Sequence, residues 1–511
     1  HVVTPGDPGK ADVHFDFDST KAHPISPYVY GTNQGDFTKE AKHLTLARVG
    51  GNRITAYNWE TNASNAGSDY QYENDDYMSS SKVAGKPMKD AVQAASDAGA
   101  SIIMTVPIAG WVAADEDGPC NAHPSGNAEI AQRFVPIVAK KGSAFSYPPD
   151  TTDGKVYADE FVAWLESAFP NAQTDASRRI FYMLDNEPDL WSSTHSEIHP
   201  DAVSYAELAQ KNVAFAAAIK AVAPKAIVFG PVDYGWEGYV DLQMAPDANG
   251  RDWLEFWLDQ MKAAEASHGA RLVDVLDVHW YPEATGDGAR ITDDGTSPGE
   301  VEARLQAPRS LWDATYTETS WITQYSTNGP IALIPRLMKK IAAHYPGTKL
   351  SISEYNYGAG GDVSGGIAQA DALGVFGREG LFAAANWLLS GNNDYLFAAF
   401  AMYRNYDGHG AAFGDTSIDA TNDAVAKASD YASIDASSPT NVVAVVINKE
   451  ATPLVAGIRI THTSALTKAD AYTLTSAAAA PKAASALASV ARNAFSYTMP
   501  PFSVTTLVFK P

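Results

Sequence analysis

The chain has 511 residues, and its 37 lysines and arginines stand against 60 aspartates and glutamates, a formal net charge of −23. Such a negative field repels phosphate backbones and anionic lipids, which argues against nucleic acid and membrane surfaces as partners. No apolar run of roughly 18 residues is present, so no membrane-spanning helix is expected. With 45% hydrophobic residues there is ample material for a core, and we expect one large and one smaller domain.

Cysteine content and the first residue bear on where the protein works. Cys120 is the single cysteine, which excludes an intrachain disulfide. A chain so poor in cysteine fits a cytosolic enzyme and a secreted bacterial one equally. The sequence begins at His1 without the basic and apolar stretches of a signal peptide. We expect a secreted protein whose signal peptide has been removed, an expectation that depends on the function inferred below.

Short apolar or β-branched runs alternate with longer helical stretches through most of the chain. The expected strands are Tyr28–Asn33, Leu46–Gly50, Ser101–Pro107, Arg179–Leu184, Ala226–Pro231, Leu272–His279, Lys349–Glu354 and Tyr395–Tyr403. The helices expected between them include Met88–Ala98, Ala158–Ala168, Tyr205–Val222, Trp253–Ala266 and Ile331–His344. Eight strands separated by helices predict an α/β fold, a (β/α)8 TIM barrel over residues 27–414.

After about Asp415 the pattern changes to strands without helices of matching strength between them. The expected strands are Val442–Asn448, Ala456–Thr461, Ala471–Thr475 and Phe502–Val508. The alanine-rich stretch Ser476–Val490 contains Pro481, and we expect a loop or a poor helix there. Residues 415–511 are therefore predicted to form a smaller β-sandwich. Alternation in Val13–Phe17 indicates that residues 1–26 add a strand to the same sandwich.

Two glutamates stand where an apolar strand ends, which is where a barrel of this type carries its chemistry. Glu187 lies in the run FYMLDNEP (residues 181–188), and the preceding Asn186 could hydrogen-bond a sugar 2-hydroxyl. Glu354 ends the β-branched strand in LSISEYNYG (residues 350–358). The two are 167 residues apart, which fits three βα units with insertions. We place them on strands four and seven, facing each other across the barrel mouth.

Paired carboxyl groups at such positions fit glycoside hydrolysis. That reaction needs one carboxyl group that holds a proton near neutral pH and one that stays ionised. In retaining enzymes the two groups lie about 5–5.5 Å apart and the ionised one forms a covalent intermediate, whereas inverting enzymes separate them by about 6.5–9.5 Å. A single strand-end glutamate is most often only a solvated side chain, so the inference depends on the pair.

The residues around both glutamates also make the sequence similar to a known family. The matching motifs are YNWETN (57–62), SNAGSDY (64–70), DNEP (185–188), LWSSTH (190–195), IHP (198–200), SEYNYG (353–358), MYRNYDG (402–408) and PPFSVT (500–505). With these motifs the chain resembles glycoside hydrolase family 44 over nearly its whole length. The resemblance implies a barrel plus a β-sandwich built from both chain ends, and retaining endo-cleavage of β-1,4-glucans such as cellulose derivatives, mixed-linkage glucan or xyloglucan.

The resemblance also assigns roles to individual residues. It implies that Glu187 is the acid/base and Glu354 the nucleophile, that no cofactor takes part in catalysis, and that a metal, commonly calcium, is bound. We expect the pKa of Glu187 to be raised by burial and by repulsion from Glu354, so that activity has a bell-shaped pH dependence.

Further residues at strand ends are candidates for contact with the substrate or the nucleophile. Arg48, which ends the second strand, could keep Glu354 ionised through a charge-assisted hydrogen bond, with a structural salt bridge as the alternative. His279 or Tyr281, at the end of the sixth strand, could orient Glu354, and a buried histidine with a structural role is the alternative for His279. The sequence leaves these alternatives open.

Aromatic side chains are abundant, and sugar rings stack on flat aromatic faces. Trp280, just past a strand, and Trp321, in a polar loop, are the strongest candidates for such stacking. Trp387 lies in the predicted helical run Gly380–Leu389, where packing is the alternative.

Acid-rich loops supply candidates for the metal. Ca²⁺ takes six to eight oxygen ligands from several loops, and we expect it to be held by Glu60, Asp150 and Asp153. The sequence DTTDG (150–154) has loop character but is not an EF-hand. His195 and His199 have the spacing of a zinc pair but lack the glutamate spacing of a metalloprotease, so catalytic zinc is not expected.

Three alternative functions remain open at this point. One is another retaining barrel glycosidase, such as a xylanase, mannanase or arabinofuranosidase. The second is an inverting hydrolase, and the third is a non-catalytic carbohydrate-binding protein, in which replacement of either glutamate would leave function intact. In the favoured interpretation the protein is a monomer whose partner is a β-glucan polysaccharide.

Overall fold

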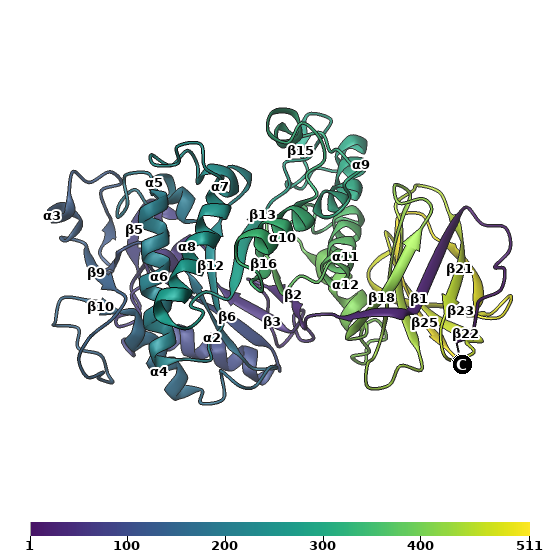
Figure 1. The fold of residues 1–511 in the computed structure, drawn as a ribbon, viewed down its shortest axis with the longest axis horizontal. Helices are drawn as coiled ribbons and strands as arrows, with labels where there is room; N and C mark the ends of the chain where they lie inside the picture. The colour runs from purple at the N-terminus through teal and green to yellow at the C-terminus, as the bar shows by residue number, and fades with distance from the viewer. Residues whose placement is uncertain (1) are drawn as a thin grey trace.

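The computed structural model describes residues 2–511 as a barrel and a β-rich domain beside it (Figure 1). The parallel strands that close the barrel are β2 (Tyr28–Thr32), β3 (Leu46–Val49), β6 (Ser101–Val106), β11 (Ile180–Leu184), β12 (Val228–Asp233), β13 (Val275–Trp280), β16 (Lys349–Tyr355) and β17 (Ala383–Asn386). Their order around the barrel is their order along the chain. The predicted (β/α)8 barrel with a second β domain is confirmed. Within residues 2–511 no helix is both long and apolar enough to cross a membrane.

Helices pack around the outside of the barrel. The long ones are α2 (Lys86–Asp97), α4 (Ala158–Ala168), α6 (Tyr205–Val222), α8 (Trp253–His268), α10 (Leu333–His344), α11 (Val363–Arg378) and α12 (Asp394–Arg404). Ser204 and Asp252 cap the amino termini of α6 and α8, each by accepting a backbone N–H three residues ahead. Helix α10 buries Leu333, Leu337 and Ile341, which its period of 3.6 residues places on one face.

Short elements connect the barrel strands to these helices. The helical ones are α1 (Asn52–Thr55), α3 (Asn127–Ile130), α5 (Trp191–Thr194), α7 (Trp236–Asp241), α9 (Pro298–Gln306), η1 (Gly67–Tyr70), η2 (Pro188–Leu190), η3 (Ala307–Leu311) and the π-helical η4 (Ile322–Ser326). The extended ones are β4 (Ser64–Asn65), β5 (Glu73–Asp75), β7 (Trp111–Ala113), β8 (Gly118–Pro119), β9 (Phe134–Val138), β10 (Val156–Tyr157), β14 (Thr285–Gly286) and β15 (Ala289–Arg290).

Apolar side chains fill the amino-terminal half of the barrel interior. The buried set is Tyr28, Leu46, Ile103, Phe181, Met183, Phe229, Val232, Val275 and Ala383. Most of them come from the first residues of their strands, so this end of the barrel is a packed core rather than a pore. Polar side chains inside the barrel are consequently left to its carboxyl end.

The eighth barrel strand was predicted in the wrong place. Tyr395–Tyr403 lies within helix α12, where Leu396, Phe400 and Tyr403 are buried at helical spacing. The strand is β17, with the sequence AAAN, inside a run that was predicted to be helical. Alanine favours helices, but pairing with both β16 and β2 in a fully buried position overrides that propensity.

The second domain is a nine-stranded sheet that folds over on itself. Besides β1 (Val13–Pro24) its strands are β18 (Thr416–Asn422), β19 (Ala428–Ile434), β20 (Val442–Asn448), β21 (Leu454–Thr461), β22 (Lys468–Thr475), β23 (Ala478–Ala488), β24 (Ala494–Met499) and β25 (Ser503–Lys510). Phe495 of β24 and Phe509 of β25 lie far apart in the strand order, yet their ring centroids are 4.8 Å apart. The sheet therefore encloses a core in the manner of a β-sandwich.

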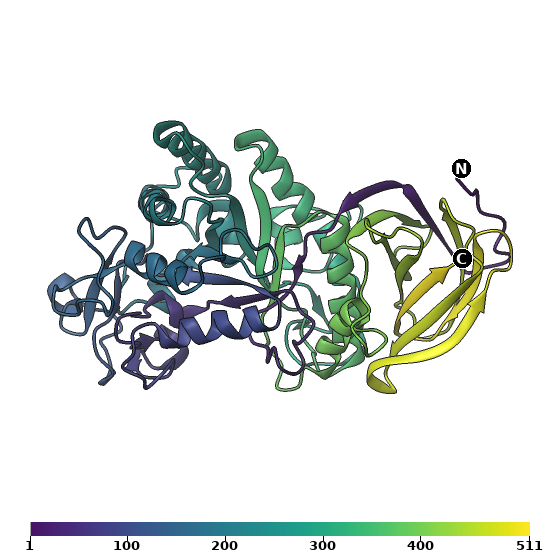
Figure 2. The ribbon, with the colours of Figure 1, turned by 90° about the horizontal axis from the view of Figure 1, so that it is seen from below.

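Both ends of the chain contribute strands to this sandwich. Strand β1 runs antiparallel to β18 and parallel to β21, and Figure 2 shows it in purple among the green and yellow strands. The loop or poor helix predicted for Ser476–Val490 is wrong, because most of that stretch is strand β23. Since β23 pairs with β22 alone at the edge of the sheet, Pro481 costs no hydrogen bond to a second neighbour.

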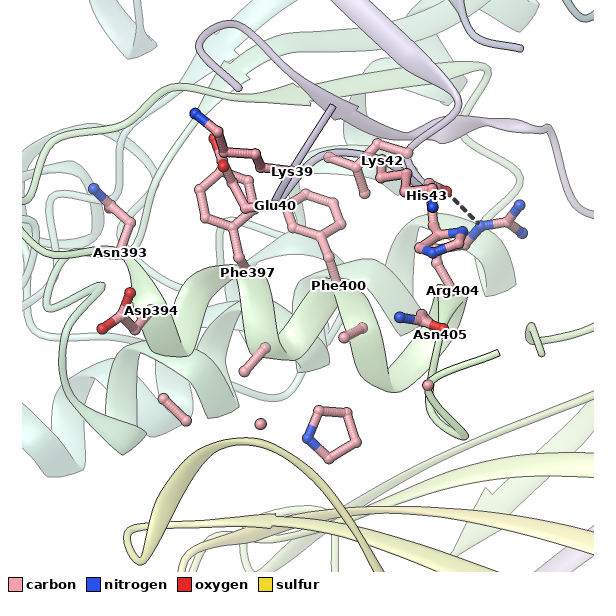
Figure 3. A pocket seen from close by; sticks show the side chains of 17 residues that line it. Lys39, Glu40, Lys42, His43, Asn393, Asp394, Phe397, Phe400, Arg404 and Asn405 are labelled. Atoms are coloured by element: carbon pink, nitrogen blue, oxygen red, sulfur yellow. Dashed lines mark hydrogen bonds between the residues drawn. The ribbon is translucent and has the colours of Figure 1, made fainter. Parts of the chain in front are cut away.

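The barrel and the sandwich meet along α11 and α12. An open groove of about 710 Å³ follows α12, between residues 39–44 and Ala479–Pro481 of β23 (Figure 3). Its acidic side chains, Glu40 and Asp394, are exposed. Beside it, Asp371 of α11 forms a buried ion pair with Lys449 of the sandwich at 2.7 Å and accepts a hydrogen bond from Tyr431. The domains are thus joined by charge as well as by apolar packing.

We expect Lys449→Met to lower the free energy of unfolding by about 3–5 kcal/mol, because it leaves the Asp371 carboxylate buried without a counter-charge. The matched control is Lys510→Met, which breaks the half-exposed pair with Asp470 and is expected to cost less than about 1 kcal/mol. Denaturant unfolding measures both. Equal small losses would contradict a structural role for the buried pair.

Candidate active site

A cavity of about 340 Å³ lies at the carboxyl ends of the barrel strands. Its lining consists of Gly51, Asn52, Asp69, Asn186, Glu187, Tyr234, Tyr281, Arg290, Thr292, Glu354, Trp387 and Leu389. Both predicted glutamates line this cavity, Glu187 just after the fourth strand and Glu354 within the seventh. The larger groove along α12 shares none of these residues.

A strained backbone positions Glu187. Asp185 and Glu187 both have positive φ angles, 67° and 44°, which non-glycine residues rarely adopt. The buried Asp185 carboxylate holds this conformation by accepting four hydrogen bonds. Its donors are the backbone N–H groups of Ile108, Ala109 and Asn186 and the hydroxyl of Thr55. Glu187 is thereby fixed at the barrel mouth.

The environment of Glu187 favours its protonated form. Burial raises the pKa of Glu187 to about 8, against the positive charges of Arg48 and His195, which lower it. The predicted contribution of burial is confirmed. The neighbouring charge that raises the pKa is Asp69, however, and not Glu354 as predicted.

Two side-chain donors hold the carboxyl group of Glu354. Arg48, itself buried, donates from Nη1 to Oε1 of Glu354 at 2.6 Å. The hydroxyl of Tyr281 donates to Oε2 at 2.7 Å. Both contacts are stronger when the acceptor carries a negative charge. The structure therefore brings Arg48 and Tyr281 together at Glu354.

His279 lies between the two glutamates. Its Nδ1 is 2.8 Å from Oε1 of Glu187 and 3.4 Å from Oε2 of Glu354. Burial lowers the pKa of His279 to about 3, so the ring is neutral. Nε2 has no hydrogen-bond partner within residues 2–511, and we therefore assign the proton to Nδ1. One carboxylate oxygen of Glu187, one ring nitrogen of His279 and one carboxylate oxygen of Glu354 all lie within 4.8 Å of one another. The two carboxyl groups therefore approach each other to within 4.8 Å.

Known proteins resemble this chain in sequence and in fold. The model of glycoside hydrolase family 44 matches residues 63–284. Endoglucanase A of Paenibacillus lautus is 40% identical over 504 residues, which are 95% of this chain and 71% of that protein. The chain belongs to glycoside hydrolase family 44.

Two further similarities support that membership. A beta-mannanase/endoglucanase A of Caldicellulosiruptor saccharolyticus is 39% identical over 506 residues, and the chain spans 37% of its length. The structure of a family 44 xyloglucanase from Paenibacillus polymyxa with xyloglucan superposes with a TM-score of 0.92 at 38% identity, covering 98% of this chain and 99% of that one. The family 44 protein described here is therefore a glycoside hydrolase.

The three tryptophans predicted to contact substrate have different surroundings. Trp387 follows β17 directly and lines the cavity, and a Cβ on Gly51 would lie only 2.5 Å from its ring. Trp280 is 2% exposed, packs in the apolar core and is not part of the cavity lining, so its contact with substrate stays a prediction. Trp321 precedes η4, is partly buried, and is not part of the cavity lining.

The predicted calcium ligands are not part of the cavity lining. Glu60 is buried, and its Oε1 has no hydrogen-bond partner within the described residues. Burial and the charges of Asp153, Glu160 and Asp150 raise the pKa of Glu60 to about 8. The oxygens of Glu60, Asp150 and Asp153 are not gathered within 4.8 Å; in residues 2–511 that criterion selects the set around His279.

Several cavity residues were not predicted from the sequence. They are Gly51, Asn52, Asp69, Tyr234, Arg290, Thr292 and Leu389. Asp69 belongs to the SNAGSDY motif, which was the available signal, but the motif does not say which of its side chains faces the substrate.

We expect Arg48→Met to lower kcat/KM by about 10²-fold, because Glu354 loses its charged hydrogen-bond donor in the cavity. The assay is hydrolysis of a soluble β-glucan, with circular dichroism to confirm folding. Arg459→Met, which removes an exposed arginine paired with Asp16 on the sandwich, is the control and should leave kcat/KM unchanged. A folded Arg48→Met variant with full activity would contradict the role given to this contact.

Proposed function

We propose that the protein is a retaining endo-β-1,4-glucanase in which Glu187 is the acid/base and Glu354 the nucleophile. The observation that carries the proposal is the carboxyl pair itself. The two groups have atoms within 4.8 Å of each other, near the spacing of about 5–5.5 Å typical of retaining enzymes and well short of the inverting range. Their surroundings also differ, since burial favours the proton on Glu187 whereas Arg48 and Tyr281 both donate to Glu354.

In the first step the ionised Glu354 attacks the anomeric carbon while Glu187 protonates the departing glycosidic oxygen. Because Nδ1–H of His279 donates to Oε1 of Glu187, the proton of Glu187 itself belongs on Oε2, where it is free to face the substrate. Asn186 accepts from Arg48 at Oδ1 and donates one hydrogen of Nδ2 to Asn52, which leaves the second hydrogen of Nδ2 for the 2-hydroxyl of the sugar.

In the second step a water molecule attacks the glycosyl ester, and Glu187 accepts its proton. Esterification removes the negative charge of Glu354, so the charge of Arg48 is no longer balanced. Since Arg48 lowers the pKa of Glu187, the acid of the first step becomes the base of the second. The sugar leaves with its original configuration.

The substrate proposed is a β-1,4-glucan, with xyloglucan included. The relatives at 40% and 39% identity are both named as endoglucanases, and the structural neighbour is a xyloglucanase. The mannanase activity in one name is a weaker guide, because this chain spans only 37% of that protein. Since such polymers cannot enter a cell, we also propose that the protein is secreted.

Two measurements test the mechanism. NMR of the first product from a soluble glucan is expected to show the β-anomer, whereas an α-anomer would rule out retention. In Glu187→Ala, azide should restore turnover and yield a β-glycosyl azide, because the small anion attacks the glycosyl intermediate without a base. Glu354→Ala, the matched variant across the cavity, should form no β-glycosyl azide. Azide rescue with the opposite pattern would exchange the two roles.

We further propose that Glu60, Asp150 and Asp153 hold a structural Ca²⁺. Oε1 of Glu60 has no hydrogen-bond partner in the described residues and lies among acidic side chains, a setting that suits a cation. The cation would balance their negative charge and draw the loop at 150–153 against the barrel. Catalysis itself needs no cofactor, since two carboxyl groups suffice.

Removal of the metal with EDTA is therefore expected to lower the thermal midpoint by about 3–5 °C without abolishing activity at 25 °C. Added Ca²⁺ should restore the midpoint in the wild type and in Glu40→Gln, an exposed control, but not in Glu60→Gln. Differential scanning calorimetry measures the change. A midpoint that ignores EDTA and Ca²⁺ would contradict the site.

A further inference from the structure

Asp69 places a third carboxylate at the cavity. It lies on η1 and is exposed, unlike Glu187 and Glu354, and it lines the same 340 Å³ space. Neither proposed catalytic step uses it. Its position raises the question of what an additional negative charge does beside the acid/base.

A chain of hydrogen bonds leads from Arg48 to Asp69 along the cavity wall. Arg48 Nη2 donates to Oδ1 of Asn186 at 2.8 Å, and Asn186 Nδ2 donates to Oδ1 of Asn52 at 3.2 Å. Asn52 Nδ2 then donates to Oδ2 of Asp69 at 3.0 Å. Arginine can only donate and a carboxylate can only accept, so the two ends fix the direction of both amides between them. Without an acceptor at position 69, the Asn52 amide is free to turn and to oppose the amino group of Asn186.

The backbone holds Asp69 rigidly against the loop that carries the acid/base. Gly67, at φ 59°, begins η1, and a Cβ there would lie 1.9 Å from the carbonyl oxygen of Thr194. The N–H of Gly67 donates to Oδ1 of Asn65 at 2.7 Å. Only glycine permits so close an approach to the segment that follows Glu187. The separation between Asp69 and Glu187 is therefore set by main-chain packing.

The negative charge of Asp69 is one of several charges that affect the pKa of Glu187. The titratable and charged groups that face Glu187 are Arg48, Asp69, Asp189, His195, Tyr234, His279, Tyr281 and Glu354. Arg48 and His195 lower the pKa of Glu187, and His279 is neutral. Asp69 is the charge that raises it. A protonated Glu187 thus has support from a carboxylate outside the catalytic pair.

We propose that Asp69 is a positioning residue for glycoside cleavage: it ends the hydrogen-bonded chain that aims the Asn186 amide at the substrate, and its charge favours the protonated form of Glu187. The inference rests on the roles proposed above for Glu187 and Asn186. Asp69 thus has two effects, the hydrogen bond to Asn52 and the charge beside Glu187. They can be separated, because a substitution can keep the hydrogen bond while it removes the charge.

Two variants separate the effects. Asp69→Asn keeps an acceptor for Asn52 but removes the charge, and Asn52→Ala breaks the chain but keeps the charge. We expect the alkaline limb of the kcat/KM profile on neutral xyloglucan to move to lower pH by about half a unit in Asp69→Asn. We expect Asn52→Ala to lower kcat by about tenfold with the limb in place. The penalty in Asn52→Ala should shrink on an aryl 2-deoxy-β-glycoside, which lacks the hydroxyl that Asn186 contacts.

Asp394→Asn is the control for a lost acidic charge and should leave both profiles unchanged, since Asp394 is exposed in the groove along α12, which shares no lining residue with the cavity. An alkaline limb in Asp69→Asn that coincides with the wild type would overturn the proposal. So would an Asn52→Ala variant with wild-type kcat, or one whose loss is equal on the 2-deoxy substrate. Azide rescue of Glu187→Ala tests the acid/base role of Glu187 separately. If azide rescues that variant while Asp69→Asn or Asn52→Ala gives one of these contrary results, the role of Asp69 is wrong and the role of Glu187 stands.

Discussion

The catalytic end of the barrel depends on one buried guanidinium. Arg48 is 2% exposed, and its hydrogen-bond partners come from four different places in the barrel: Asn33, Met183, Asn186 and Glu354. A Cβ on Gly50 would lie 2.3 Å from the guanidinium carbon, so the chain next to Arg48 is shaped around it. Burying a cation is costly, and only a nearby anion with several acceptors offsets that cost. Glu354, 2.6 Å from Arg48, is the acidic partner of this guanidinium, so the packing of this end couples the positions of the two side chains.

Burial affects all the polar side chains at the carboxyl end of the barrel, whereas the charge of Arg48 affects mainly the groups beside it. Desolvation disfavours every charged form, which raises the pKa of Glu187 and lowers that of His279. The apolar plug of Phe181, Phe229 and Val275 below excludes water from the barrel floor. The two carboxyl groups thus have different surroundings, because Glu354 accepts from the guanidinium directly and Glu187 does not.

The sequence predicted those parts of the structure that local pattern determines. Seven of the eight barrel strands, and the strand ends at Glu187 and Glu354, follow from apolar runs that stop at a polar residue. Strand β17 was missed because four small residues carry no periodicity, and its pairing with β16 and β2 is a tertiary effect. The burial of Trp280 in the apolar core was not predicted, because the surroundings of a strand-end side chain depend on how β13 packs. Asp69 was missed for a related reason, since its role comes from a hydrogen-bonded chain across loops far apart in sequence.

The missed strand also lies where the sandwich is attached to the barrel. Strands β17 and β2 form the seam at which the barrel closes, and Asn33, just past β2, donates to the carbonyl oxygens of Ala385 and Asn386 across it. β2 begins four residues after β1 ends, and β1 is a central strand of the sandwich. On the other side of the seam, α12 is tied to the sandwich where Thr506 donates to the carbonyl oxygen of Met402. The seam consists of small residues, and contacts with the sandwich on both sides of it stabilise it. Trp387, which follows β17, is thereby held in the cavity lining.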